Sequence, residues 1–164
     1  MKEFHRSIRN LEVEKLISEL NNKTDLKGTM LSICSSQSPD VKSQIDIIKI
    51  LIKHGVNINE KDKNGVSPLH RAVRFRKPEI VKFLIANGAD VNCVDKRSAS
   101  TPLHRAVVNS GAPSTKGKNQ EAKRIIEILL ANGADPNLKN KKGNTPFDYV
   151  KKESFKKLFA KQIM

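Results

Sequence analysis

Residues 67–73 read Ser67-Pro68-Leu69-His70-Arg71-Ala72-Val73, and 34 residues later the chain returns to the same pattern as Thr101-Pro102-Leu103-His104-Arg105-Ala106-Val107. A partial third copy reads Thr145-Pro146-Phe147-Asp148-Tyr149-Val150. A second motif also recurs, since Ile85-Ala86-Asn87-Gly88-Ala89-Asp90-Val91-Asn92 is answered by Leu130-Ala131-Asn132-Gly133-Ala134-Asp135-Pro136-Asn137, with a weaker early version at residues 52–59. Two motifs that alternate at a nearly fixed period predict a stack of similar structural units.

The first motif predicts the start of a short helix in each copy. Its Ser or Thr can accept a hydrogen bond from a free helix N–H, and proline at the first helical position loses no hydrogen bond there. Three residues after the cap, His70, His104 or Asp148 can reach back to the backbone N–H of the capping residue. Each of these three segments is therefore expected to open a helix.

A second helix is expected to follow in each clear copy. Residues 80–85 and 125–130 both place apolar side chains at the spacing of one helical face. A glycine then ends each second helix, because glycine tolerates the left-handed backbone found at helix C-termini. These glycines are Gly55, Gly88 and Gly133. The polar stretch between Gly88 and Thr101 is too short for another helix and fits an extended turn.

A unit of two short helices and an extended turn, at a period near 33 residues, resembles the ankyrin repeat, whose signature includes Thr-Pro-Leu-His-x-Ala. The resemblance is strong from about Asn57 to Tyr149 and weaker outside these residues. It implies an all-α solenoid of stacked helix-turn-helix units with β-hairpin or turn connections, and about three repeats plus N- and C-terminal capping helices. Such repeats mostly recognise proteins or peptides, usually on the concave side that the hairpin tips and first helices line.

We expect one domain over residues 1–164, with a cap at 1–26, a degenerate repeat at 27–59, repeats at 60–94 and 95–138, and a cap at 139–164. The degenerate repeat carries Gly28-Thr29-Met30-Leu31-Ser32-Ile33-Cys34, which lacks the proline and the histidine. Terminal units are expected to be atypical because one of their faces meets water. Apolar spacing indicates a helix pair in the first cap, carried by Phe4, Ile8, Leu11, Val13, Leu16, Ile17 and Leu20, and an amphipathic helix in the last, carried by Phe155, Leu158, Phe159 and Ile163.

The repeat at 95–138 contains a 12-residue insertion near residues 110–121, because Gly88 and Gly133 lie 45 residues apart whereas Gly55 and Gly88 lie 33 apart. An insertion that spares the motif residues belongs in a surface loop, here between two helices and at the end opposite the hairpin tips. A flexible loop and an ordered loop that contacts a partner both remain open. The segment is not a phosphate-binding loop, because five residues separate its glycines and Asn119 replaces the required hydroxyl residue.

Two positions depart from the family pattern. Arg76 stands where the first helix usually ends in glycine, so either the turn differs there or Arg76 adopts a strained left-handed backbone. The turn at residues 95–100 is one residue longer than its counterpart and lacks the tip glycine. This second departure predicts an irregular tip in the middle of the stack.

The net charge of +14 increases along the chain. Residues 1–26 are neutral, residues 27–59 carry +2, residues 60–94 and 95–138 carry +3 each, and residues 139–164 carry +6. In a solenoid, the order of repeats in the sequence is also their order in space. We therefore expect a rod that is neutral at its N-terminal end and strongly positive at its C-terminal end.

The hairpin tips are expected to bring basic side chains into one row, because equivalent positions of a solenoid stack on one another. The tip residues are Lys63, Asn64, Lys96, Arg97, Lys141 and Lys142. The first-helix positions that the ankyrin resemblance places beside them are Arg71, Arg74, Phe75, Arg105, Val108, Asn109, Tyr149 and Lys152. One interpretation is a basic concave surface for an acidic protein partner, with Phe75 and Tyr149 as aromatic anchors. The other is a solvated, lysine-rich surface that keeps the chain soluble.

The sequence shows no pattern typical of a catalytic, metal or cofactor site. His70 and His104 have capping roles, and the other two histidines have no Cys or carboxylate at ligand spacing. Cys34 and Cys93 do not make a disulfide framework, so we expect two free thiols in a reducing compartment. We see no signal peptide and no apolar run of membrane-spanning length. We expect a cytoplasmic monomer, with host-directed secretion as the alternative if the Lys- and Asn-rich composition reflects an AT-rich intracellular bacterium or virus.

These observations favour a non-catalytic protein–protein interaction module that binds an acidic protein partner through a basic concave face. The alternative is binding of nucleic acid or anionic lipid through the basic C-terminal end. Net charge supports this alternative, but the chain lacks a recognised nucleic-acid motif and interleaved aromatic residues. A structural or regulatory subunit that masks a partner is a third possibility, which the sequence does not separate from the first.

Overall fold

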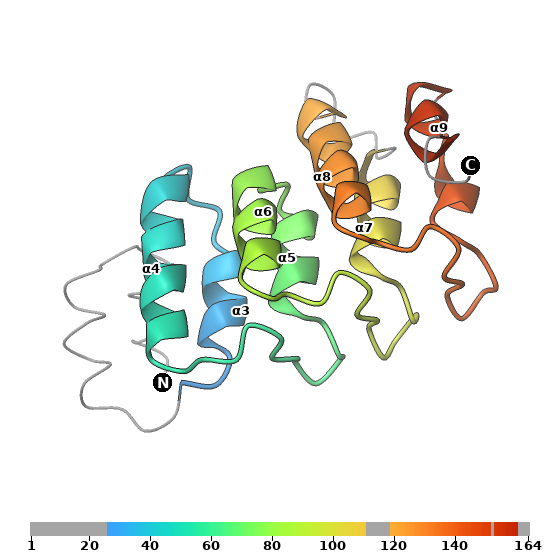
Figure 1. Ribbon diagram of the computed structural model, residues 1–164. Coiled ribbons are helices and arrows are strands. Elements are labelled where there is room, and N and C mark those ends of the chain that lie inside the picture. The colour runs from blue at the N-terminus through green and yellow to red at the C-terminus, as the bar shows by residue number, and fades with distance from the viewer. Residues whose placement is uncertain (1–25, 111–118, 152, 161–164) are drawn as a thin grey trace.

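The computed structural model describes residues 26–110, 119–151 and 153–160, so the predicted N-terminal helix pair, most of the insertion, Lys152 and Ile163 lie outside the described residues. Helices follow one another in pairs that lie side by side in chain order (Figure 1). The pairs are α3 (Thr29–Cys34) with α4 (Val41–Lys53), α5 (Pro68–Arg74) with α6 (Pro78–Ala86), and α7 (Pro102–Ser110) with α8 (Asn119–Ala131), followed by the 3₁₀ turn η2 (Phe147–Tyr149) and by α9 (Glu153–Ala160).

The first helices of the three pairs form one layer and the second helices form the other (Figure 1). Turns rather than strands connect one pair to the next within the described part of the chain. Backbone hydrogen bonds close each turn, among them those from Asp62 N to Val66 O, from Asp95 N to Ser100 O, and from Asn140 N to Asn144 O. The predicted all-α solenoid is confirmed, and its β-hairpin connections are hydrogen-bonded turns.

The capping interactions predicted for the first motif are present in both clear copies. The backbone N–H of His70 donates to Ser67 Oγ at 3.3 Å, and the backbone N–H of Ser67 donates to His70 Nδ1 at 3.3 Å. The N–H of His104 and the side chain of Thr101 repeat this arrangement at 3.3 Å. Both motifs therefore begin a helix, α5 and α7, as the sequence predicts.

The third copy does not begin an α-helix, which corrects our expectation. Only half of the capping arrangement forms: Asp148 Oδ2 accepts hydrogen bonds from Thr145 N at 2.7 Å and from the Thr145 hydroxyl at 2.9 Å, and only the 3₁₀ turn η2 follows. Phe147 is 39% exposed, whereas the equivalent Leu103 is buried between repeats. An exposed Lys151 also stands where α7 has a buried valine, so this segment lacks the apolar face that would hold a helix against a neighbour.

A continuous apolar core runs between the two layers and ends at the predicted C-terminal helix. Phe155 and Phe159 of α9 are 3% and 0% exposed, and the Phe159 ring packs edge-on against Phe147 with 5.7 Å between ring centroids. Cys34 and Cys93 are buried free thiols, and burial raises the pKa of each. Among the described helices, none combines the length and apolar composition that crossing a bilayer requires.

Asparagine side chains join each repeat to the next. Asn59 Nδ2 donates to the backbone oxygen of Gly88 at 2.9 Å, and Asn59 Oδ1 accepts from the N–H of Asp90 at 2.8 Å. Asn92 repeats both bonds one repeat further on, with the backbone oxygen of Gly133 and the N–H of Asp135, at 3.0 and 2.8 Å. These paired bonds fix the register of neighbouring repeats, because an amide satisfies a donor and an acceptor together.

Both departures from the family pattern have structural counterparts. Arg76 has φ of 54° and Ala99 has φ of 51°, and these are the described non-glycine residues with positive φ. Arg76 keeps the expected turn between α5 and α6 with a left-handed backbone, so the second alternative is confirmed in its geometry. Ala99 takes the place of the tip glycine in the longer turn, which makes that tip irregular, as predicted.

Candidate partner-binding surface

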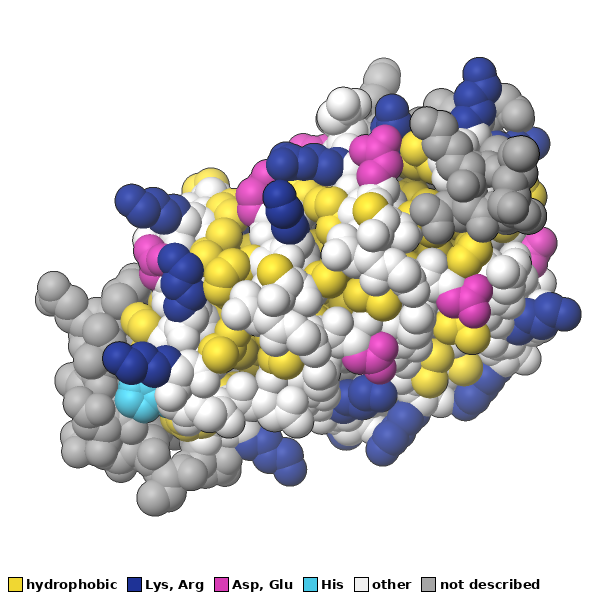
Figure 2. Space-filling view, in the orientation of Figure 1, with side chains coloured by type: hydrophobic (Ala, Val, Ile, Leu, Met, Phe, Trp, Pro, Cys, Tyr) yellow, Lys and Arg dark blue, Asp and Glu magenta, His cyan; other side chains and the backbone are white. Residues whose placement is uncertain are grey.

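The three turns place their basic residues along one edge of the stack. We call residues 62–66, 95–100 and 140–144 tips 1, 2 and 3, and their predicted binding residues the tip row. All six side chains of the tip row are exposed: Lys63, Asn64, Lys96, Arg97, Lys141 and Lys142. In Figure 2, Lys and Arg side chains project along the lower edge, where the turns of Figure 1 lie.

Hydrogen bonds connect each tip to the next, so the tip row is continuous despite the irregular tip 2. The N–H of Lys96 donates to the backbone oxygen of Asn64 at 2.8 Å, and the N–H of Lys141 donates to that of Ser98 at 2.9 Å. The ammonium group of Lys141 also donates to the backbone oxygen of Lys96 at 2.5 Å. Lys141 thus supports tip 2, while the extra residue of that tip is accommodated without breaking the row.

Two of the predicted binding residues form ion pairs with aspartates of the tips. Arg71 Nη2 lies 2.8 Å from Asp62 Oδ2, and Arg105 Nη2 lies 3.1 Å from Asp95 Oδ2. Burial alone would raise the pKa of each carboxyl group, but hydrogen bonds from the turn backbone and the paired arginine outweigh it and hold the pKa below its usual value. Each arginine side chain is 28% exposed, so both guanidinium groups brace a tip against the first helix.

The third tip replaces this ion pair with a neutral contact. Asn140 and Tyr149 stand at the positions of the aspartate and the arginine, and Asn140 Nδ2 donates to the Tyr149 hydroxyl oxygen at 2.9 Å. Asn144 Nδ2 donates to the same oxygen at 3.2 Å. The tyrosine therefore braces tip 3 as the arginines brace tips 1 and 2, but it adds no charge of its own.

Two hollows separate the tips from the first helices. The hollow between tips 1 and 2 has a volume of about 180 Å³, and the hollow between tips 2 and 3 has a volume of about 430 Å³. The smaller hollow is lined by Asp62, Asn64, Val66, His70, Arg71, Arg74, Asp95, Arg97 and Arg105. The larger is lined by Arg97, Ser98, Ser100, His104, Val108, Asn140, Lys141, Lys142 and Tyr149. The structure thus brings most of the predicted site residues together.

Phe75 and Asn109 lie elsewhere, which corrects their predicted place beside the tips. Phe75 lies at the α5–α6 turn, on the edge of the stack opposite the tips (Figure 1). It lines a different hollow, together with Pro39 and Lys77. The backbone oxygen of Asn109 accepts a hydrogen bond from Arg76 in the same region. Phe75 and Tyr149 therefore do not form one pair of aromatic anchors.

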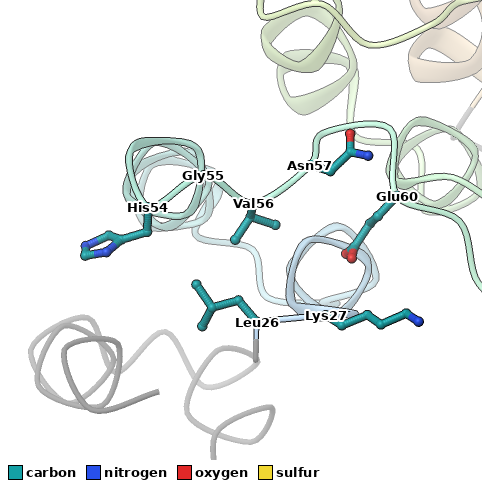
Figure 3. Close-up of a pocket in the computed structure, with 7 residues that line it drawn as sticks. All are labelled: Leu26, Lys27, His54, Gly55, Val56, Asn57 and Glu60. Atoms are coloured by element: carbon teal, nitrogen blue, oxygen red, sulfur yellow. The ribbon is translucent and has the colours of Figure 1, made fainter. Parts of the chain in front are cut away.

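A fourth hollow, of about 340 Å³, lies at the start of α3 (Figure 3). The Glu60 carboxylate accepts hydrogen bonds from the N–H of Gly28 at 2.8 Å and the N–H of Leu31 at 3.1 Å. It therefore caps α3, whose Gly28 offers no side chain for this purpose. His54 points away from Glu60 in Figure 3, and within the described residues no cluster of potential metal ligands is present.

Comparison with known proteins identifies the repeat. Residues 4–95 match the family model for ankyrin repeats in three copies, and residues 100–141 match that for a single ankyrin repeat. The chain belongs to the ankyrin repeat family. It is 37% identical over 62 residues to a putative ankyrin repeat protein of Acanthamoeba polyphaga mimivirus, and 35% identical over 71 residues to one of Fowlpox virus (strain NVSL). It is 30% identical over 148 residues to the SMC5-SMC6 complex localization factor protein 1 of Bos taurus.

The shared regions are short parts of these relatives. They cover 38%, 43% and 88% of this ankyrin-repeat chain, in the order mimivirus, fowlpox and Bos taurus, but only 8%, 43% and 13% of the relatives themselves. The chain therefore spans less than half the length of each of these relatives. The similarity identifies the ankyrin repeat, which is a protein-interaction module and typically non-catalytic, and it leaves the partner open.

The two histidines that recur in these ankyrin repeats are structural, as predicted. His70 Nε2 faces the backbone oxygen of Ser100 at 3.0 Å and therefore carries the proton, which leaves Nδ1 to accept from Ser67. His104 Nε2 faces the backbone oxygen of Asn144 at 3.0 Å in the same way. Burial lowers the pKa of His70 to about 4 and also lowers that of His104, so both rings are neutral links between neighbouring repeats.

Sequence reasoning missed two sets of structural residues in these repeats. Asp62 and Asp95 were not assigned as partners of the two arginines, although an aspartate precedes the arginine by nine residues in one repeat and ten in the next. The linking role of Asn59 and Asn92 was also missed, although both belong to the second repeated motif. In both cases, recurrence of a polar residue at one repeat position was the available signal.

Proposed function

We propose that this ankyrin-repeat chain is a non-catalytic interaction module that binds, as a monomer, an acidic surface of a partner protein through the tip row. The observation that carries the proposal is the uncompensated charge of the row. Lys63, Lys96, Arg97 and Lys142 are exposed on one edge, while the carboxylates at the base of tips 1 and 2 are already paired with arginines. A surface of one sign attracts a partner of the opposite sign and excludes like-charged proteins.

The test compares two variants with the same change in net charge. The tip variant carries Lys63→Glu, Arg97→Glu and Lys142→Glu, and the control carries Lys42→Glu, Lys53→Glu and Lys82→Glu at exposed positions of α4 and α6. Proteins recovered with wild-type chain from a lysate are identified, purified and titrated against all three chains. We expect the tip variant to lose affinity by about tenfold or more while the control stays within about twofold. Equal affinity of the two variants would overturn the proposal.

Nucleic acid or anionic lipid is the second candidate, and the charge of the C-terminal end favours it. Residues 139–164 hold eight basic and two acidic side chains. Binding driven by phosphate contacts weakens steeply with salt and shows little sequence preference. The measurement is a salt titration with mixed-sequence duplex DNA and with vesicles that contain an anionic lipid. Binding to DNA or to the vesicles at about 150 mM salt supports this candidate, and loss of binding to both removes it.

A further inference from the structure

The hollow between tips 2 and 3 has an unbalanced positive charge. Its lining includes Arg97, Lys141 and Lys142 but no carboxylate. The smaller hollow between tips 1 and 2 differs, because Asp62 and Asp95 lie in its lining and neutralise two of its arginines. Of the two hollows beside the tip row, the larger one therefore offers an anion the stronger attraction.

Two of the three cations in this hollow remain available to a ligand. Lys141 is engaged with the backbone oxygen of Lys96. Arg97 and Lys142 are exposed, and neither side chain makes a hydrogen bond or ion pair within the part of the chain that the structure describes. Because both side chains face water and hold no partner among these residues, they can approach a ligand carboxylate without breaking an existing contact within the protein.

The Tyr149 hydroxyl supplies a directed donor at the same place. Its oxygen accepts hydrogen bonds from both Asn140 Nδ2 and Asn144 Nδ2. The orientation of the Asn140 amide is fixed, because its Oδ1 accepts from the N–H groups of Lys142 and Asn144 at 2.9 and 3.2 Å. The phenol oxygen is thus used as an acceptor twice, and its own hydrogen has no acceptor among the described residues.

The electrostatic effect of these bonds agrees with that geometry. Hydrogen bonds from Asn144 and Asn140 lower the pKa of Tyr149, because two donors aimed at the phenol oxygen stabilise its negative form. A phenol whose conjugate base is stabilised gives a stronger hydrogen bond to an anionic acceptor. Tyr149 is therefore a better donor to a carboxylate than an unassisted tyrosine.

An apolar surface adjoins these polar groups. Val108, on α7, lines the same hollow and is 51% exposed, which makes it one of the few large apolar side chains so exposed among the described residues. The Tyr149 ring also lines this hollow and packs edge-on against His104, with 6.3 Å between ring centroids. An aliphatic group placed here would cover apolar surface that now faces water.

We propose that the hollow between tips 2 and 3 binds a carboxylate side chain of an acidic protein segment together with a neighbouring aliphatic side chain. The Tyr149 hydroxyl donates to the carboxylate, Arg97 and Lys142 balance its charge, and Val108 contacts the aliphatic group. This inference rests on the proposed function and adds the ligand chemistry that the tip row recognises. It distinguishes a mixed acidic and aliphatic segment from a purely anionic polymer.

The test titrates unlabelled synthetic peptides into the full-length, ¹⁵N-labelled chain and follows amide chemical shifts. One peptide contains a Glu-Leu-Glu segment within a Gly-Ser-rich sequence, and the control peptide contains Gln-Leu-Gln. We expect shifts around the hollow and an affinity for the Glu peptide about tenfold higher than for the control peptide. Tyr149→Phe should weaken binding about fivefold and Lys142→Glu about tenfold, whereas Lys63→Glu at tip 1 should change it less than about twofold.

Several results would overturn the proposal. These are equal affinity for the two peptides, wild-type affinity of Tyr149→Phe, equal weakening by Lys63→Glu and Lys142→Glu, or no shifts at peptide concentrations of about 10 mM. Val108→Ser, at an exposed position, gives a second test if Tyr149→Phe disturbs tip 3, and its expected effect is about threefold weaker binding. None of these results would contradict the proposed function, which is the binding of a folded acidic protein by the tip row. Shifts with duplex DNA but with neither peptide would contradict the proposed function as well.

Discussion

Arg76 in one repeat binds Asn109 in the next, through a hydrogen bond of 3.1 Å from its Nη2 to the backbone oxygen of Asn109. The same arginine has φ of 54°, a left-handed conformation that costs a non-glycine residue roughly 1–2 kcal/mol. A favourable contact and an unfavourable backbone conformation therefore coincide at one position, and two substitutions can separate them.

Arg76→Ala removes the contact and keeps the strain, whereas Arg76→Gly removes both. We expect the alanine variant to unfold with a free energy about 1–2 kcal/mol below that of the wild type, because the carbonyl of Asn109 loses a charged donor. The glycine variant should be about 1 kcal/mol more stable than the alanine variant. Urea denaturation measures both differences. A glycine variant no more stable than the alanine variant would show that position 76 is unstrained.

Gly65→Ala should disrupt the contact between tips 1 and 2. Gly65 has φ of 74°, and an added Cβ would lie 2.8 Å from the backbone nitrogen of Lys96, which must stay close to donate to Asn64. Gly88→Ala is the matched control, because its φ is 90° and its Cβ would meet no atom within 4 Å. We expect the control to lose about 1 kcal/mol of stability and Gly65→Ala to lose about 2–3 kcal/mol. Equal losses in thermal or urea unfolding would contradict the close approach.

Replacement of the two tip carboxylates should have unequal effects. Asp95 has a side chain only 1% exposed and accepts from the N–H of Ser98 at 2.7 Å as well as from Arg105, whereas the Asp62 side chain is 19% exposed. Asp95→Asn removes a buried carboxylate and leaves the partly exposed Arg105 guanidinium without its counter-charge, which should cost about 2–3 kcal/mol of unfolding free energy. Asp62→Asn should cost about 1 kcal/mol, because water can replace part of the lost interaction. Equilibrium denaturation near neutral pH ranks the two variants, and the reverse order would refute this explanation.

Stability should decrease as the pH falls below the ordinary pKa of histidine. In the folded chain the pKa of His70 is about 4, against about 6.5 when unfolded, so between these values the unfolded state binds the additional proton. The contribution of the neutral His70 ring to the free energy of unfolding is fully present above about pH 6.5, is lost progressively below this pH, and is gone near pH 4. The lowered pKa of His104 acts in the same direction. We expect roughly 2 kcal/mol lower stability near pH 5 than near pH 7.

Urea denaturation at several pH values tests this dependence. The control is His54→Gln, because the His54 side chain is exposed at the end of α4 and makes no link between repeats. This variant should retain the decrease in stability between neutral pH and about pH 5. A wild-type stability that stays constant over this range would show that neither buried ring resists protonation.

Repetition made the architecture predictable from the sequence. The Ser67 and Thr101 caps, the helices after them and the row of turns follow from local chemistry that each copy repeats, so local and tertiary preferences agree. The C-terminal helix is predicted on another ground, because Phe155 and Phe159 lie at helical spacing on one apolar face. The prediction of an α-helix after Thr145 was wrong, because capping interactions alone do not stabilise a helix when the residues after them lack a buried face.

The candidate surface was predicted less completely than the fold. Repeat alignment gives the position of a side chain but not its partner, so it predicts Arg71 and Arg105 as binding residues although each is paired with an aspartate. Phe75 is misplaced because it follows the last residue of α5, where the chain turns away from the tips, although the preceding Arg74 still lines the hollow between tips 1 and 2. Whether the tip row binds an acidic partner stays a prediction.

The side chains that link neighbouring repeats also determine how the molecule would respond to force. The Asn59 amide and the His70 ring both attach one repeat to the next, and Asn92 and His104 do the same at the following border between repeats. A pull along the stack loads these borders in series, so extension should occur in steps, with the weakest border opening first. The same arrangement makes the chain a short spring, whose stiffness depends on a few hydrogen bonds at each joint.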